Sequence, residues 1–245
     1  ATVGGDALVR LWEVSIQADG DATLAHLEDL EGHTAGLRDV IWHPHHPRLL
    51  TIGDDERMIL WDTEANDVLI NEFSHSPRAV SYRADGRYIA VIDNRGVVTV
   101  VDSDKEHANV NIGMFSTSGL DVTWNQNKNA IATIDADGNL NLYDNYRVGT
   151  ICHDSNCPHI ELIKNLNDPG QIAFSPNGSM IAATSRGSMH IMEAQAPYRQ
   201  VNWYVPVVQE DNPLFTAVAW SLRNDVMAAG DEQGAIHIWD VQSEI

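Results

Sequence analysis

The sequence predicts an all-β fold assembled from repeated antiparallel sheets, and three observations point to it. Short alternating runs of apolar and polar residues, separated by turn residues, fill most of the 245-residue chain. An aromatic or apolar position recurs 40 to 49 residues apart, at positions 12, 61, 101, 143, 192 and 239. In several copies a threonine and an acidic turn residue stand at fixed distances before it. A period of this length is typical of a repeated four-stranded unit.

The clearest copy runs from Gly32 to Asp62 and predicts four antiparallel strands. Thr51 lies ten residues before Trp61, and the turn acid Asp55 lies six residues before it. Because the residues between them alternate in polarity around a turn, we expect paired strands here. The same spacing occurs twice more, with Thr2, Asp6 and Trp12 near the start of the chain and Thr133, Asp137 and Tyr143 in its middle.

Three other copies keep the strand pattern and lose part of the polar set. They cover residues 89–102, 180–192 and 226–240. An aromatic residue followed by a turn precedes the buried strand of most copies, and these aromatic residues are Trp42, Tyr82, Trp124, Phe174 and Trp220. We therefore expect six units, of which the first lacks its inner strand.

The polar residues of the clearest copy suit a buried structural role. His33, Thr51, Asp55 and Trp61 can form a hydrogen-bonded chain from indole to hydroxyl, to imidazole, to turn carboxylate. We call this set the staple, and we expect the corresponding Thr2, Asp6, Trp12, Thr133, Asp137 and Tyr143 to act in the same way. The rival interpretation is a hydrolase triad, because the residue types overlap. It is disfavoured because a strand-buried threonine exposes no nucleophile and no oxyanion loop is evident.

Catalytic motifs are missing from the sequence. The patterns G-x-S-x-G, H-E-x-x-H, G-x-x-x-x-G-K-[ST] and G-x-G-x-x-G do not occur. The sequence therefore predicts a protein that is not an enzyme, has no catalytic residues and uses no cofactor or small-molecule substrate.

Two histidine-containing tracts have residue types that can hold a metal ion. Cys152, His153, Cys157 and His159 have the composition of a zinc site. Four ligands this close rarely surround a tetrahedral ion without a second ligand pair elsewhere, so a connecting loop with reduced cysteines is the alternative. A proline-containing turn explains His43, His45 and His46. We expect no metal at either tract.

The charge balance restricts the classes of partner. Fifteen basic and 35 acidic residues give a net charge of −20, which would repel a nucleic-acid backbone and favours a basic partner. No apolar run approaches the ~20 residues that span a bilayer. With two cysteines and no visible secretory leader, the sequence predicts a reducing compartment, the cytosol or the nucleus.

Acidic residues also gather in the turns between the buried strands. The repeat geometry places these turns on one face, which we call the acidic rim. Its members beyond the staple acids are Asp54, Glu56, Asp93, Asp135, Asp231 and Glu232. One interpretation is that this rim receives a Lys/Arg-rich segment of a partner. The other is that turns favour aspartate for its local hydrogen bonding.

The repeat resembles the WD-repeat family, because the fixed spacing, the turn acids and the Trp-Asp pairs at 61–62 and 239–240 recur together. Within that family the chain is similar to the WD-repeat subunits of the THO complex, part of the TREX mRNA-export assembly. The likeness rests on residues 32–33, 42–44, 89–91, 97–102, 122–125 and 215–220. It implies a WD-repeat β-propeller acting as a nuclear scaffold held by large protein subunits, with RNA contacted mainly through those subunits.

Two departures from the family pattern affect the expected domain. The resemblance implies seven blades, whereas six units are visible, and residues 145–165 show no blade pattern. We expect one propeller domain over residues 1–245 with parts missing at the amino end and near residue 165, or closure by a partner strand. Two alternative functions remain: a substrate receptor of a cullin-type ubiquitin ligase, or a basic-peptide (histone-tail) reader. The first is disfavoured because neither Trp-Asp pair is followed by the arginine of a W-D-x-R motif.

Overall fold

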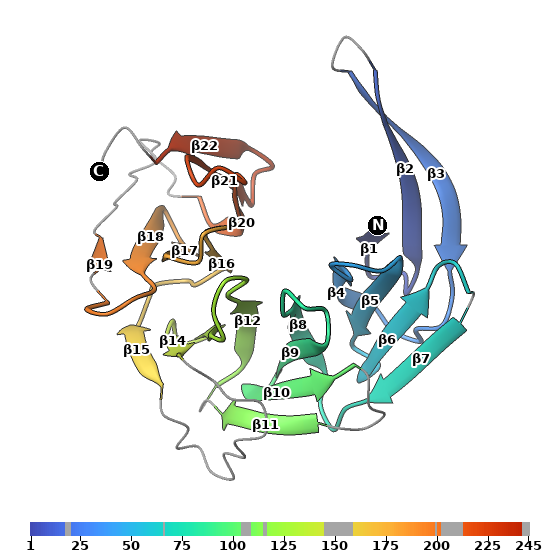
Figure 1. Cartoon of the computed structure of the whole chain (residues 1–245), viewed down its shortest axis with the longest axis horizontal. Helices are drawn as coiled ribbons and strands as arrows, with labels where there is room; N and C mark the ends of the chain where they lie inside the picture. Colours follow the sequence, from blue (N-terminus) through green and yellow to red (C-terminus); the bar gives the residue numbers. More distant parts are fainter. Residues whose placement is uncertain are drawn as a thin grey trace. The chain divides into compact units, whose positions relative to one another are not determined.

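The computed structural model describes residues 1–17, 21–65, 67–103, 109–114, 117–144, 159–198, 200–201 and 213–241. The described residues form six antiparallel sheets of three or four strands (Figure 1). No helix long and apolar enough to cross a membrane occurs among them. The prediction of an all-β fold made of repeated sheets is confirmed. Internal contacts divide the chain into two compact units, Ala1–Val80 and Ser81–Ile245, which are described separately.

The first unit contains two sheets. In each sheet, strands that follow one another in the sequence are hydrogen-bonded neighbours, as expected for units joined by short turns. The first sheet holds β1 (Thr2–Val3), β2 (Val9–Ile16) and β3 (Ala22–Leu30), and the second holds β4 (Leu37–Trp42), β5 (Arg48–Gly53), β6 (Arg57–Asp62) and β7 (Asp67–Glu72). The three-stranded first sheet agrees with the expectation that the first copy lacks a strand.

The remaining four sheets lie in the second unit, except that β8 crosses the division between the units. The third sheet holds β8 (Pro77–Tyr82), β9 (Tyr88–Asp93), β10 (Val97–Asp102) and β11 (Asn109–Met114). The fourth holds β12 (Gly119–Trp124), β13 (Ile131–Asp135), β14 (Leu140–Tyr143) and β15 (Ile160–Ile163). The fifth holds β16 (Ile172–Phe174), β17 (Met180–Ser185), β18 (Ser188–Glu193) and β19 (Gln200–Val201), and the sixth holds β20 (Phe215–Trp220), β21 (Val226–Asp231) and β22 (Ile236–Asp240).

The aromatic residues noted in the sequence mark strand ends. The first strands of the second to sixth sheets end at Trp42, Tyr82, Trp124, Phe174 and Trp220. The expectation of no blade pattern from 145 to 165 needs correction, because β15 lies inside that range and pairs with β14. Its four residues, Ile-Glu-Leu-Ile, are too short to give a clear alternating signal. Residues 145–158 lie outside the described part of the chain.

The core consists of the middle strands and the faces between neighbouring sheets. In the first unit, Val9 and Leu11 of the first sheet pack with Leu49, Ile59 and Trp61 of the second. Leu49 and Ile59 have no exposed surface. In the second unit, similar apolar clusters join the fourth sheet to the fifth and the fifth to the sixth. Burial of these apolar faces is the main favourable term that stacks the sheets.

Carboxylates on two first strands accept backbone N–H groups from outside their own sheet. The Asp121 carboxylate on β12 accepts a hydrogen bond from the Ile172 N–H on β16, at 2.8 Å. The Asp39 carboxylate on β4 accepts one from the Val80 N–H on β8, at 3.1 Å. Each bond satisfies a strand N–H that would otherwise lack a partner within its own sheet.

Candidate partner-binding face

The staple residues of the second sheet meet in one buried hydrogen-bonded chain. The Trp61 Nε1–H donates to Thr51 Oγ1 at 2.8 Å, and Thr51 Oγ1 lies 2.9 Å from His33 Nε2. His33 Nδ1 lies 2.9 Å from both Asp55 carboxylate oxygens. Because the threonine oxygen already accepts from the indole, its own hydrogen is directed to His33 Nε2, and His33 Nδ1–H then donates to Asp55. Thr51 is fully buried, so its hydroxyl cannot meet a substrate.

The Asp55 carboxylate remains charged despite its enclosure. Burial alone would raise the pKa of Asp55, but hydrogen bonds from the Thr34 N–H and from His33 outweigh that effect and hold it below the usual 3.8. The charge thus stabilises the turn and orients the imidazole at the same time.

The other two predicted staples are only partly formed. In the first copy the Trp12 Nε1–H donates to Thr2 Oγ1 at 2.8 Å, while Asp6 pairs instead with Arg10 at 2.6 Å. In the third copy, burial raises the pKa of Tyr143 to about 12. Thr133 is near enough to oppose that rise, but its buried hydroxyl lacks the geometry of a hydrogen bond. The other residue predicted for that copy, Asp137, is exposed.

Asp135, two residues earlier, takes the turn position expected of Asp137. Its carboxylate accepts the Asn139 N–H at 2.9 Å and the Asn139 side-chain amide. Asp6 and Asp137 are therefore not staple residues of the kind seen at Asp55. The reason is local: Arg10 attracts Asp6, and the Asp135 carboxylate is better placed to satisfy the turn.

Sequence reasoning missed a second carboxylate–imidazole pair, in the sixth sheet. Asp231 Oδ2 lies 2.8 Å from His237 Nε2, and Asp231 Oδ1 accepts the backbone N–H groups of Gln233 and Ala235. The bond with His237 is the largest cause of the lowered pKa of Asp231. The His237 ring also stacks on Trp239. The sequence feature that indicates this pair is the position of His237, two residues before Trp239 and across the hairpin from the turn acid Asp231.

The acidic rim is smaller than predicted. Asp93, Asp135 and Asp231 are only 8%, 1% and 8% exposed, and all three accept N–H groups of their own turns. This part of the prediction is corrected: a short carboxylate at the end of a strand reaches the turn amides, and this bonding buries it. Of the remaining members, Asp54 and Glu232 pair with Arg38 and Arg186, and Glu56 and Glu232 are exposed.

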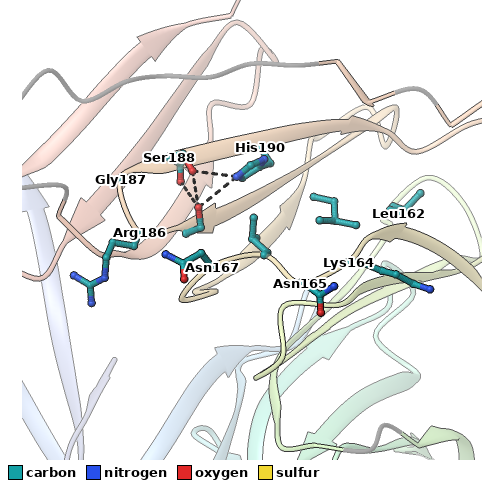
Figure 2. A pocket seen from close by; sticks show the side chains of 11 residues that line it. Leu162, Lys164, Asn165, Asn167, Arg186, Gly187, Ser188 and His190 are labelled. Atoms are coloured by element: carbon teal, nitrogen blue, oxygen red, sulfur yellow. Dashed lines mark hydrogen bonds between the residues drawn. The ribbon is translucent and has the colours of Figure 1, made fainter.

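A polar pocket of about 660 Å³ opens beside the turns of the second unit (Figure 2). It lies between the connection from β15 to β16, residues 162–167, and the hairpin of β17 and β18, residues 185–190. Ser188 Oγ lies 2.6 Å from Ser185 Oγ and 3.0 Å from His190 Nε2. Ser185 and Ser188 are 1% and 8% exposed, so the pocket has a buried hydroxyl pair in its wall.

Backbone hydrogen bonds anchor the two walls of this pocket. The Leu166 N–H donates to the Gly138 carbonyl at 3.0 Å, and the Arg186 N–H donates to the Asn167 carbonyl at 3.3 Å. The Arg186 guanidinium bonds Asp168 through Nε at 2.6 Å and Glu232 through Nη1 at 3.3 Å. The lining residues, all of them described, include Lys164 and Arg186 and no aspartate or glutamate.

His190 is expected to make the stability of the second unit depend on pH. Burial lowers the pKa of His190 below the usual 6.5, so the unfolded chain takes up the proton first as the pH falls. The stabilisation is therefore complete above pH 6.5 and is lost as the pH falls toward the lower folded value. Urea unfolding between about pH 7.5 and about pH 5 should show a decline that His190→Gln reduces. Titration of the His190 ring by NMR at or above its ordinary value would contradict this expectation.

The histidine tracts do not form a metal site in the described part of the chain. His43 Nδ1 accepts the backbone N–H groups of His45 and His46, both at 3.0 Å, which is the geometry of a turn. His159 lies against the Tyr143 ring. No group of three candidate metal ligands gathers among the described residues. Cys152, His153 and Cys157 lie outside them.

One segment of the chain matches a known family. Residues 25–62 match the family model described as WD domain, G-beta repeat. This segment contains the complete staple, from His33 to Trp61. The repeated antiparallel sheets of three or four strands, together with this match, are consistent with blades of a WD40 β-propeller. The fold class predicted from the sequence is therefore confirmed.

Several curated proteins are similar to the chain at low identity. Minichromosome loss protein 1 of Schizosaccharomyces pombe is 23% identical over 99% of this chain and 28% of its own length. WD repeat-containing protein 35 of Homo sapiens is 26% identical over 58% of the chain and 13% of its own length. THO complex subunit 3 of Arabidopsis thaliana is 29% identical over 41% of the chain and 31% of its own length. The chain thus spans less than a third of each of these relatives.

Proposed function

We propose that this chain is a non-enzymatic scaffold module that holds protein partners within a nuclear multiprotein complex. The observation that carries the proposal is how the blades use their polar residues. His33, Thr51 and Asp55 resemble a catalytic set, but they form a buried hydrogen-bonded chain with a structural role. The outer surface of the blades includes turns and connections. WD repeats generally bind other proteins through such surfaces.

The charge of the chain supports protein partners that carry basic segments. A net charge of −20 steers basic surfaces toward the protein and repels nucleic acid. RNA or DNA would then be contacted mainly through the partners. Glu56 and Glu232 are the exposed rim residues that suit such contacts, and Asp54 is partly exposed.

Two complexes are candidates, and different observations favour them. The predicted THO/TREX role in mRNA export is supported by the similarity to THO complex subunit 3, which covers 41% of the chain. A complex that maintains chromosomes is supported by the similarity to minichromosome loss protein 1, which covers 99% of the chain. Because the second similarity extends over all six sheets, we favour the chromosome-maintenance complex.

Affinity purification tests the scaffold role and separates the two complexes. The tagged protein, in the full length in which it occurs in its source cells, is captured from nuclease-treated nuclear extract and its partners are identified by mass spectrometry. We expect stoichiometric large subunits of one complex, with chromosome-maintenance proteins as the favoured result and THO subunits as the alternative. Recovery of cullin-ligase components would support a substrate receptor, and recovery of histones with a lone protein would support a histone-tail reader. Either would contradict the proposal.

The same purification tests the remaining rim with a matched charge reversal. Glu56→Lys should weaken capture of a basic partner and flatten its salt dependence, because it replaces an attractive charge by a repulsive one. Glu31→Lys is the control, since Glu31 is also exposed in the first unit but lies outside the turn. If both variants capture the partner equally well, the rim is not part of the interface.

A further inference from the structure

The hairpin of β2 and β3 in the first unit has an outer half without a core. The two strands are paired along their whole length, and of their residues only Val9 and Leu11, at the base, are buried. The outer half extends beyond the second sheet (Figure 1), and residues 13–17 and 21–29 are all exposed. Because a two-stranded hairpin is only marginally stable by itself, an outer half of this length gains stability when another surface covers it.

One face of the outer half is apolar, and we call it the hairpin stripe. It consists of the side chains of two cross-strand pairs, Val14 with Leu24 and Ile16 with Ala22. The opposite face carries Glu13, Ser15 and Thr23. Such alternation is typical of a sheet that buries its apolar face, yet the exposed fractions of Val14, Leu24 and Ile16 are 60%, 68% and 76%.

The exposed apolar surface of the first unit is concentrated on this hairpin. Among the described residues of that unit, every large apolar side chain that is more than half exposed lies on β2 or β3. Scattered apolar side chains are ordinary on a protein surface, whereas a contiguous group marks an interaction site. The pairing described above makes the hairpin stripe contiguous.

The charge around the hairpin stripe decides which kind of partner suits it. Residues 9–30 contain five acidic residues and one lysine or arginine, Arg10. Arg10 pairs with Asp6 at 2.6 Å, and His26 pairs with Asp29 at 2.6 Å, so neither offsets the charge of the other acids of the hairpin.

Among those other acids, Glu13, Asp21 and Glu28 are exposed. Their charges act over a Debye length of roughly 8–10 Å, which spans the narrow two-stranded ribbon. A second copy of the chain would bring like charges together, both here and through its net charge of −20. From the apolar stripe and its acidic surroundings we infer that the hairpin docks a segment of a partner protein whose apolar residues are flanked by lysine or arginine.

The hairpin stripe is held in place at both ends. At the base, the Trp12 Nε1–H donates to Thr2 Oγ1 at 2.8 Å, and the Trp12 ring lies edge-on to the His26 ring, with 5.3 Å between the centroids. At the outer end, the Gln17 N–H donates to the Asp21 carbonyl at 2.8 Å. A surface ordered before the partner arrives lowers the entropic cost of docking. The inference rests on the proposed role of holding protein partners, and it names one surface for them.

Site-specific photocrosslinking tests the inference in the protein at the full length in which it occurs in its source cells. The photoreactive residue p-benzoylphenylalanine replaces Val14 on the hairpin stripe or, as the control, Ser15 on the opposite face, and each protein is irradiated in nuclease-treated nuclear extract. We expect a crosslink from position 14 alone, to a peptide in which mass spectrometry finds apolar residues flanked by lysine or arginine. A crosslink to a second copy, to another part of the same chain or to a segment without lysine or arginine overturns the inference. An equal yield from position 15, or no crosslink from position 14, also overturns it.

Matched double variants measure what the hairpin stripe contributes to docking. Val14→Thr combined with Ile16→Thr should weaken capture of the crosslinked partner by roughly tenfold, because it removes apolar surface and keeps the β-branched shape. The control makes the same two changes on β7, Val68→Thr with Ile70→Thr, where the side chains are 45% and 44% exposed. All four side chains are exposed, so the temperature of unfolding should stay unchanged in both variants. An equal loss in the control, or no loss in the hairpin variant, overturns the assignment.

The docking surface and the scaffold role can fail separately. If the large subunits of a complex are recovered in stoichiometric amounts but position 14 gives no crosslink to a basic segment, the docking surface is wrong and the scaffold role stands. If no such subunits are recovered, the scaffold role is wrong, and the crosslink from position 14 still decides whether the hairpin docks a basic segment.

Discussion

Replacing Thr51 by valine is expected to lower the free energy of unfolding by about 3 kcal/mol, because buried donors and acceptors left unpaired cost roughly 1–3 kcal/mol each. The shape of the side chain is kept, so packing changes little. What is lost is the hydroxyl that accepts from the Trp61 indole and donates to His33 Nε2. Thr51 has no exposed surface, so water cannot replace either bond.

Thr51→Ser is the control, since it keeps the hydroxyl and removes one methyl group, at a cost of about 1 kcal/mol. Urea unfolding gives the difference in free energy, and hydrogen exchange at Leu49 and Ile59 locates it in β5 and β6. If valine and serine destabilise the protein equally, the staple contributes only packing, and the hydrogen-bonded chain does not stabilise the blade.

The staple shows why much of the fold could be predicted from the sequence. A buried indole requires an acceptor, and a buried imidazole requires partners on both nitrogens. The spacing of Thr51, Asp55 and Trp61 therefore indicates a hairpin that brings these side chains together. The same reasoning located the first strands, whose aromatic ends at Trp42 and Trp124 precede turns. Periodicity therefore predicts the repeated sheets from the sequence alone.

The candidate site was less predictable, because it depends on which neighbour a side chain meets. Asp54 and Asp93 look alike in the sequence, yet Asp54 turns outward to Arg38 and Asp93 accepts two amides of its own turn. His237 belongs to a carboxylate pair that the spacing rule did not include, because it lies on the third strand of its sheet. The polar pocket joins residues about twenty positions apart through the fold, which no local pattern reveals.

The net charge of the chain affects which partners approach it. The overall charge of −20 acts at long range and sets which partners approach, with a strength that falls as salt is added. A partner with a basic segment suits this charge, and its capture is expected to decrease with Glu56→Lys.

Gly138→Ala is expected to be the most destabilising change in the turns, at about 3–5 kcal/mol, through left-handed strain together with overpacking. Gly138 has a φ of +76°, and a Cβ placed there would lie 2.2 Å from the Leu166 carbonyl oxygen and 2.3 Å from the Leu166 nitrogen. Those atoms belong to backbone that is itself hydrogen-bonded to Gly138, so the clash cannot be relieved by a side-chain rotation.

Gly234→Ala provides the matched comparison, because Gly234 occupies the same position in the Asp-x-x-Gly turn before β22. Its φ is +86°, but nothing lies within 4 Å of an added Cβ. The change should therefore cost only the left-handed strain, about 1–2 kcal/mol. Urea unfolding of the two variants isolates the steric contribution of the connection before β16. Equal destabilisation would mean that residues 164–167 yield easily and that the connection before β16 does not form a rigid wall of the polar pocket.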